Sequence, residues 1–260
     1  MKAGVAVLAA LLLALSVGVQ AGAVPKRDGD LEITFDSDLH PSRLPRETLA
    51  PISIRVAGNV RSASGHQDQV PQLRRITVAI NRQGRLFDRG LPTCSVKSIQ
   101  PATEAAARRI CGDSIVGEGH VRVQARIPGQ LPFSVGARLL AFNGPRRAGR
   151  KLILAQAYAR DPPGAFVLTF NVVRKPGREL GTILSTTLPP ETERWAYLTH
   201  FDLTLHRTYN YGWKRRSYVS AACSAPTGFD VALFTLARAT YEFTGGKRLS
   251  TSVAKTCRVT

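Results

Sequence analysis

The segment Tyr209–Tyr218 is the best candidate in the chain for binding chemistry, because it interleaves aromatic and basic side chains. Aromatic faces can stack on sugar rings or bases, while neighbouring cations attract phosphate or carboxylate groups. The alternative is a twisted hairpin tip whose aromatics pair across strands and whose cations protect a sheet edge. Because the run Lys214–Arg216 is hard to bury, we expect Trp213 to be exposed. The candidate ligand-binding residues are Tyr209, Tyr211, Trp213, Lys214, Arg215 and Arg216.

A polar row on one predicted strand holds residue types that bind metals. His200, Asp202 and His206 share one face of that strand. At roughly 3.3 Å per residue the two histidines are about 20 Å apart, too far to share one ion. His200 and Asp202 could supply two ligands, but no partner with suitable spacing follows. We therefore expect a solvent-facing row and no metal site.

The sequence Gly-Asp-Ser-Ile at 112–115 looks like the nucleophile block of the GDSL-type esterases. Those enzymes also need an Asp-x-x-His near the end, because the proton of the serine passes to a histidine oriented by a carboxylate. Three residues before the histidines that follow Ser114 stand Gly117, Tyr197 and Leu203, and none is Asp. We interpret the block as a helix end and turn, and expect no catalytic residue and no cofactor.

The chain of 260 residues carries a formal net charge of +18, with 28 arginines against 8 lysines. Such a charge attracts polyanions, such as an anionic envelope polymer or phospholipid headgroups. We do not expect nucleic acid as a partner. The alternative is that arginine-rich usage reflects a GC-rich genome, because the basic doublets are spread over the whole chain.

Residues 1–23 have the pattern of a cleaved secretory signal peptide. Lys2 precedes the apolar run Val5–Val19, and the small residues of Val19–Ala23 fit a signal peptidase site. About fifteen apolar residues are too few to span a bilayer, and no later segment approaches the roughly 18 that are needed. The sequence predicts a protein that is secreted and either extracellular or associated with the cell envelope, without a membrane span.

Alternation of apolar and polar residues with period two dominates the rest of the chain, and Val121–Ile127 is the clearest case. The segments Leu152–Ala159 and Phe166–Val173 are apolar on both sides and predict central strands. Turn residues separate the strands. This pattern predicts an all-β fold, an antiparallel β-sandwich of about twelve strands. We expect one domain over residues 24–260, with a subdivision near 145–150 as the alternative.

One short helix interrupts the strands. Residues 101–112 begin with proline, contain a run of three alanines, carry arginines in the last turn and end at glycine, all of which favour a helix. The four cysteines have no Cys-x-x-Cys spacing, so an exported protein favours two disulfides. We predict Cys94–Cys111, which would fold the helix back on its entry loop, and Cys223–Cys257, which would hold the last strand.

Several short segments, in their order and spacing, resemble a family of uncharacterised secreted proteins of high-GC Gram-positive bacteria. The resemblance extends over residues 31–259 and implies the secreted setting, but no activity, ligand or catalytic residue. The segments that carry it are Leu91–Cys94, Val116–Gly119, Leu139–Gly144, Phe201–Thr204 and Ser217–Cys223.

Two functional hypotheses follow. The first is a non-enzymatic extracellular or envelope-associated protein that binds an anionic polymer or another protein. The second is a secreted hydrolase of a polysaccharide or ester, with a site built from distant loops, since a fold does not decide a function.

Overall fold

The computed structural model describes residues 24–66, 70–189 and 196–260. The predicted signal peptide, residues 1–23, lies outside the described residues. Within the described part of the chain strands predominate and helices are few and short, so the predicted mainly β class is confirmed.

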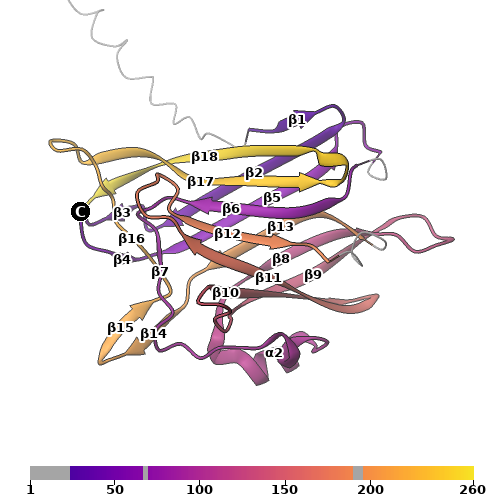
Figure 1. The fold of residues 1–260 in the computed structure, drawn as a ribbon, viewed down its shortest axis with the longest axis horizontal. Helices are drawn as coiled ribbons and strands as arrows, with labels where there is room; N and C mark the ends of the chain where they lie inside the picture. The colour runs from indigo at the N-terminus through magenta and orange to yellow at the C-terminus, as the bar shows by residue number, and fades with distance from the viewer. Residues whose placement is uncertain (1–23, 67–69, 190–195) are drawn as a thin grey trace, which may run out of the picture.

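Thirteen strands form one sheet, in the spatial order β1-β2-β5-β13-β8-β9-β10-β11-β12-β6-β17-β18-β3 (Figure 1). Neighbours run antiparallel, except that β18 and β3 pair in parallel. The strands are β1 (Lys26–Asp28), β2 (Leu31–His40), β3 (Arg43–Leu44), β5 (Ser53–Ser62), β6 (Leu73–Ile80), β8 (Ile115–Ala125), β9 (Phe133–Asn143), β10 (Lys151–Arg160), β11 (Pro163–Arg174), β12 (Thr182–Thr187), β13 (Ala196–Leu205), β17 (Val231–Phe243) and β18 (Arg248–Val259).

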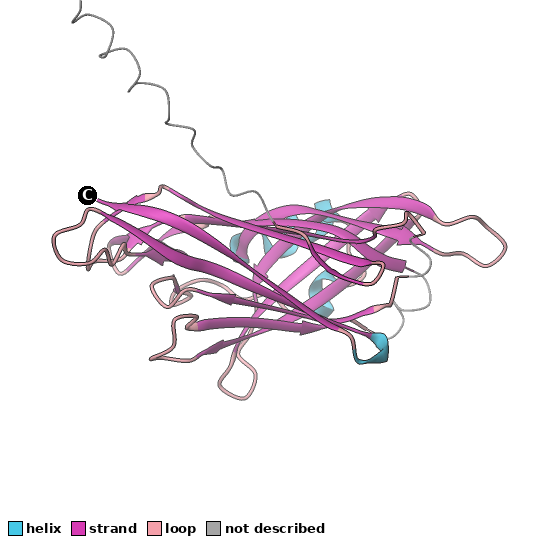
Figure 2. Cartoon of the chain, turned by 90° about the horizontal axis from the view of Figure 1, so that it is seen from above, coloured by secondary structure: helices cyan, strands magenta, loops and turns pink. Residues whose placement is uncertain are grey.

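This sheet curls over until strands from its two ends lie against each other (Figures 1 and 2). The side chain of Tyr241 on β17 donates a hydrogen bond to the carbonyl of Thr34 on β2 at 3.4 Å. Lys255 on β18 lies 3.9 Å from Asp36 and 3.7 Å from Asp38, both on β2. The main hydrophobic core therefore forms on the concave side, between parts of one sheet.

The predicted β-sandwich is wrong in its layering, because the structure has one curled sheet where two stacked sheets were expected. The physical reason is that alternation reports which face of a strand is buried, and both architectures bury one face of most strands. The sheet is continuous at residues 145–150, the alternative subdivision, since β9 and β10 flank these residues and pair with each other.

Two small sheets complete the strands. The first, in the order β4-β16-β7, closes one end of the core, and its members are β4 (Ala50–Pro51), β16 (Val219–Ala221) and β7 (Arg85–Leu86). The second is a hairpin of β14 (Thr208–Tyr211) and β15 (Lys214–Ser217). A one-turn helix η3 (Thr244–Gly246) connects β17 and β18.

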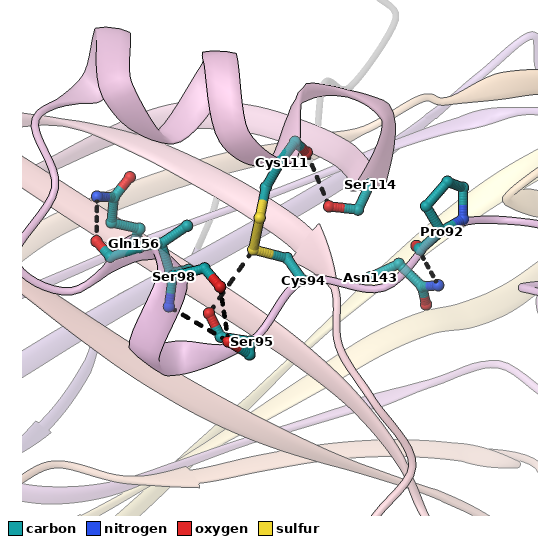
Figure 3. The surroundings of a disulfide bond; sticks show 9 residues. Pro92, Cys94, Ser95, Ser98, Cys111, Ser114, Asn143 and Gln156 are labelled. Carbon is teal, nitrogen blue, oxygen red and sulfur yellow. Dashed lines mark hydrogen bonds between the residues drawn. A yellow bond between two sulfur atoms is a disulfide. The ribbon is translucent and has the colours of Figure 1, made fainter.

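The helical excursion covers the outer face of β9 and β10 (Figure 3). It comprises α1 (Val96–Ile99), α2 (Glu104–Cys111) and the single turn η2 (Gly112–Ser114). Helix α2 begins at Glu104 rather than at the expected Pro101, and Thr103 caps it, because its hydroxyl accepts a hydrogen bond from the amide of Ala106 at 3.2 Å. Gln156 on β10 donates to the carbonyls of Ile99 and Ala102, each at 2.7 Å, and so attaches the excursion to the sheet.

Both predicted disulfides are present. Cys94–Cys111 spans a sequence separation of 17 and ties the end of α2 to its entry loop (Figure 3). Cys223–Cys257 spans a separation of 34 and holds β18 beside the chain that follows β16. These two bonds indicate an oxidising environment for the folded protein.

Candidate functional site

The concave side of the curled sheet encloses a cavity of about 380 Å³. Every described residue that lines it is Ile, Val, Leu, Phe, Ala, Pro or Gly, so the walls offer no ionisable side chain. The walls come from one face of β5, β6 and β8–β13, whose alternate residues point inward. The cavity is therefore a product of the curl and of the alternating pattern together.

Small side chains explain why the space is not filled. Ala125, Ala137 and Ala155 lie on the inner face of β8, β9 and β10, where the opposite half of the sheet carries larger residues. Close packing is the normal state of a protein interior, so a void of this size is uncommon. Leu168 and Leu198 line it and are only half-buried, because they pack against neighbours such as Ala155 on one side and face the cavity on the other.

The cavity extends toward the end of the molecule that carries the β10–β11 turn. Pro162, Pro163 and Gly164 from this turn line it, together with Leu188 after β12 and Ala196 at the start of β13. At the other end the small sheet of β4, β16 and β7 packs onto the core. Figure 1 shows the β10–β11 turn far from the hairpin of β14 and β15.

The predicted ligand-binding residues all lie in or beside that hairpin. Gly212 and Trp213 form its two-residue turn with φ of 57° and 59°, the left-handed backbone that such hairpin turns require. The strands of the hairpin pair up to Tyr211 and Lys214 on either side of this turn. Trp213 is fully exposed, as expected, and it is unusual because large residues rarely adopt a positive φ.

The two tyrosines of the hairpin contact the protein itself. The hydroxyl of Tyr209 donates to the carbonyls of Phe87 at 3.3 Å and Arg89 at 2.9 Å, and burial raises its pKa to about 12. The ring of Tyr211 lies so close to Gly90 that a Cβ there would come within 2.1 Å of it. Segment 87–90 therefore holds the hydroxyl of Tyr209 and lies against the ring of Tyr211, which stays exposed.

Two of the basic residues of the hairpin, Arg215 and Arg216, also contact the protein itself. The guanidinium of Arg216 lies 5.5 Å from the ring centre of Phe87, a cation–π contact within the protein. Arg215 donates to the hydroxyl of Thr208 at 3.5 Å, and Lys214 is exposed. Of the predicted set only Tyr209 is partly buried. Tyr209, Tyr211 and Arg216 contact segment 87–90, and Trp213, Lys214 and Arg215 are the other exposed members.

The other motifs have structural roles. The hydroxyl of Ser114 is buried and donates to the carbonyl of Cys111 at 2.7 Å, which fits the predicted helix end (Figure 3). His200 Nδ1 lies 2.8 Å from the amide oxygen of Asn59, and burial lowers the pKa of this histidine. Asp202 pairs with Arg55. Within residues 24–66, 70–189 and 196–260, no three metal-binding side chains are gathered to hold an ion.

Sequence reasoning missed the cavity. The nearest signal is the strand pair Leu152–Ala159 and Phe166–Val173, which was predicted to be central because it is apolar on both sides. Its inner face could only be recognised as a cavity wall once the curl of the sheet was known. Comparisons with protein-family models, with curated proteins and with solved structures found no match to this chain.

Proposed function

We propose that this protein is a non-enzymatic binding protein whose central cavity holds an apolar small molecule. The observation that carries the proposal is the cavity of about 380 Å³ with entirely apolar walls. Its size falls within the roughly 300–1,000 Å³ of ordinary ligand pockets. Apolar cavities exclude water and accept apolar guests, so the walls favour a hydrocarbon over a polar substrate.

The chemistry of the walls sets what the site can do. Each CH₂ group that leaves water contributes roughly 0.8 kcal/mol, so an alkyl chain gains affinity with every carbon that the cavity admits. Proton transfer or nucleophilic attack requires side chains such as His, Ser, Asp or Glu at the reacting atoms. Because the described lining has none, the cavity supports binding rather than turnover.

The test is displacement of a fluorescent apolar probe from the purified protein by alkyl compounds. We expect Ala137→Phe to weaken probe binding by tenfold or more, about 1.4 kcal/mol, because Ala137 lines the cavity and a ring would fill it. The matched control is Ala254→Phe, since Ala254 is exposed on β18. Equal loss in both variants, or no probe binding by the wild type, would contradict the proposal.

The sequence-based proposal of an anionic envelope polymer as a partner is supported by a separate observation, the full exposure of Trp213 beside Lys214 and Arg215. On this proposal Trp213→Ala weakens retention on isolated cell wall by about 1–3 kcal/mol, the usual contribution of one stacking aromatic. Thermal stability should stay unchanged. If retention on the cell wall changes neither with salt concentration nor with this substitution, the hairpin is excluded as the polymer site.

The two disulfides support our proposal of secretion to the cell exterior or envelope. The resemblance to secreted proteins of high-GC Gram-positive bacteria stays a prediction. Among the described residues, no helix has the length and apolar character to cross a membrane. The alternative of a secreted hydrolase also stays a prediction. A screen on glycan and ester substrates tests it, and turnover that is lost on mutation of a clustered carboxylate or serine would favour the enzyme.

A further inference from the structure

The β10–β11 turn separates the cavity from a polar groove on the convex side of the sheet. Pro162 and Pro163 of this turn line the cavity, whereas Arg160 and Asp161, directly before them, line the groove. The groove has a volume of about 640 Å³ and crosses β13, β8, β9 and β10. Apolar and charged surfaces therefore meet at one short turn.

The groove exists because a glycine lies between two arginines. Arg122 on β8 is directly paired with Gly136 on β9. One step along the same face, Arg138 on β9 is paired with Tyr158 on β10, so Arg160 flanks the other side of Gly136. A Cβ built on Gly136 would meet no atom within 4 Å, which leaves the floor between the two guanidinium groups open.

Most of the remaining charges of the groove pair with a neighbour, but the exposed Asp161 beside Arg160 has no ion pair within the described residues. Arg138 lies 3.1 Å from Glu118 and 3.8 Å from Glu104, and Asp202 pairs with Arg55. In the described part of the chain neither Arg122 nor Arg160 has an ion pair or a hydrogen bond through its side chain. The groove thus presents two cations, Arg122 and Arg160, against the single carboxylate of Asp161, close to the end of the cavity.

We propose that the ligand of the cavity is an amphiphile with an anionic head. Its alkyl tail occupies the cavity, and its carboxylate or phosphate group crosses the β10–β11 turn to bind Arg160 and Arg122. Guanidinium groups suit both kinds of head, because their planar donors match carboxylate and phosphate oxygens. This inference rests on the proposed function, and it adds the chemical class of the ligand.

The experiment compares dodecanoate, dodecyl phosphate and 1-dodecanol as competitors for the fluorescent apolar probe on the full protein. The three share one tail, so their difference reports the head. We expect the two anions to bind about tenfold more tightly than the alcohol, the effect of two partly exposed charge contacts. Inorganic phosphate, which has no tail, should not displace the probe.

Two variants locate the head. The double substitution Arg122→Gln and Arg160→Gln should bring the anions to within about twofold of the alcohol, with alcohol binding unchanged. Gly136→Leu should do the same without removing a charge, since it fills the floor of the groove. The control is Arg147→Gln with Arg150→Gln, two exposed arginines between β9 and β10. Thermal unfolding confirms that each variant is folded.

The outcomes separate the two proposals. Equal affinity of the wild type for all three compounds would overturn the proposal of an anionic head and leave the proposal of an apolar cavity site unaffected. A preference for anions that the control variant abolishes equally would also overturn it, because general surface charge would then be the cause. Failure of every tailed compound to displace the probe would overturn the cavity proposal itself.

Discussion

The two halves of the curled sheet are built from the same alternating strands, yet one is filled and the other is hollow. Where β17 and β18 face β2 and β5, large side chains such as Phe35 and Tyr241 are completely buried. Where β8–β12 curve away, alanines such as Ala125 and Ala137 face about 380 Å³ of empty space. Residue size on the inner face, rather than strand pattern, decides which half is hollow.

A glycine shows how tight the filled half is. A Cβ on Gly58 would lie 2.4 Å from the hydroxyl of Tyr241 and 2.6 Å from the ring of Phe201. The backbone of β5 can approach these rings only because the side chain is absent. In the hollow half, by contrast, Leu168 keeps part of its surface uncovered. The filled half stabilises the fold through close packing, whereas the hollow half is packed less closely and leaves an open space.

The largest expected effect is in the filled half. Tyr241→Ala should lower the free energy of unfolding by about 3–5 kcal/mol, because it removes a fully buried ring. Leu168→Ala in the hollow half should cost about 2 kcal/mol or less, since this side chain already faces a void. Urea unfolding of both variants measures the difference. Equal losses would mean that the two halves are packed alike.

A smaller effect comes from added volume. Gly58→Ala should destabilise the protein by about 1–3 kcal/mol, the usual cost of overpacking a filled core. Ala137→Leu should be neutral or stabilising by up to about 1 kcal/mol, because it fills part of the cavity. Thermal unfolding checks both. A loss in Ala137→Leu as large as that in Gly58→Ala would show that the cavity wall cannot accommodate the larger side chain.

Much of the fold could be predicted because short stretches of the sequence indicate the strands, the turns and the disulfides. The turn residues and the alternation located most strands, and the cysteine spacing gave both disulfides. The single curled sheet was missed because strand order depends on contacts between distant segments. The pairing of β12 with β6, for example, joins Thr182 to Ile80 across a hundred residues of chain that carry no local sign of it.

The candidate site was less predictable than the fold. The hairpin residues were predicted as a candidate site because aromatic and basic types stand together in sequence. The sequence did not indicate that Tyr209 and Tyr211 contact segment 87–90, which is distant along the chain. The cavity has no motif at all. It arises from small residues on separate strands, such as Ala125 and Ala137, whose common wall exists only after the sheet curls.

Each half of the sheet carries, on its outer face, a glutamate that forms ion pairs with two arginines. On the filled half Glu32 of β2 binds Arg27 and Arg61, and their side chains cover it. On the hollow half Arg108 of α2 donates two hydrogen bonds to Glu118 of β8, at 2.8 and 2.9 Å. The first pair of contacts holds neighbouring strands together, and the second holds the helical excursion on the sheet.

The smallest expected effects concern these carboxylates and the pH. Hydrogen bonds from arginine lower the pKa of both Glu32 and Glu118 below the ordinary value of 4.5. Because the folded-state pKa is the lower one, the stabilisation is fully present above pH 4.5 and is lost as the pH falls through the folded-state pKa. Glu32→Gln and Glu118→Gln should each flatten the decline of the melting temperature between pH 5 and 3. Only Glu118→Gln should also increase amide exchange in α2, since Arg108 joins that helix to the sheet. Exchange in α2 that rises equally in both variants would show that the acid response belongs to the whole sheet and that its two halves are not distinct.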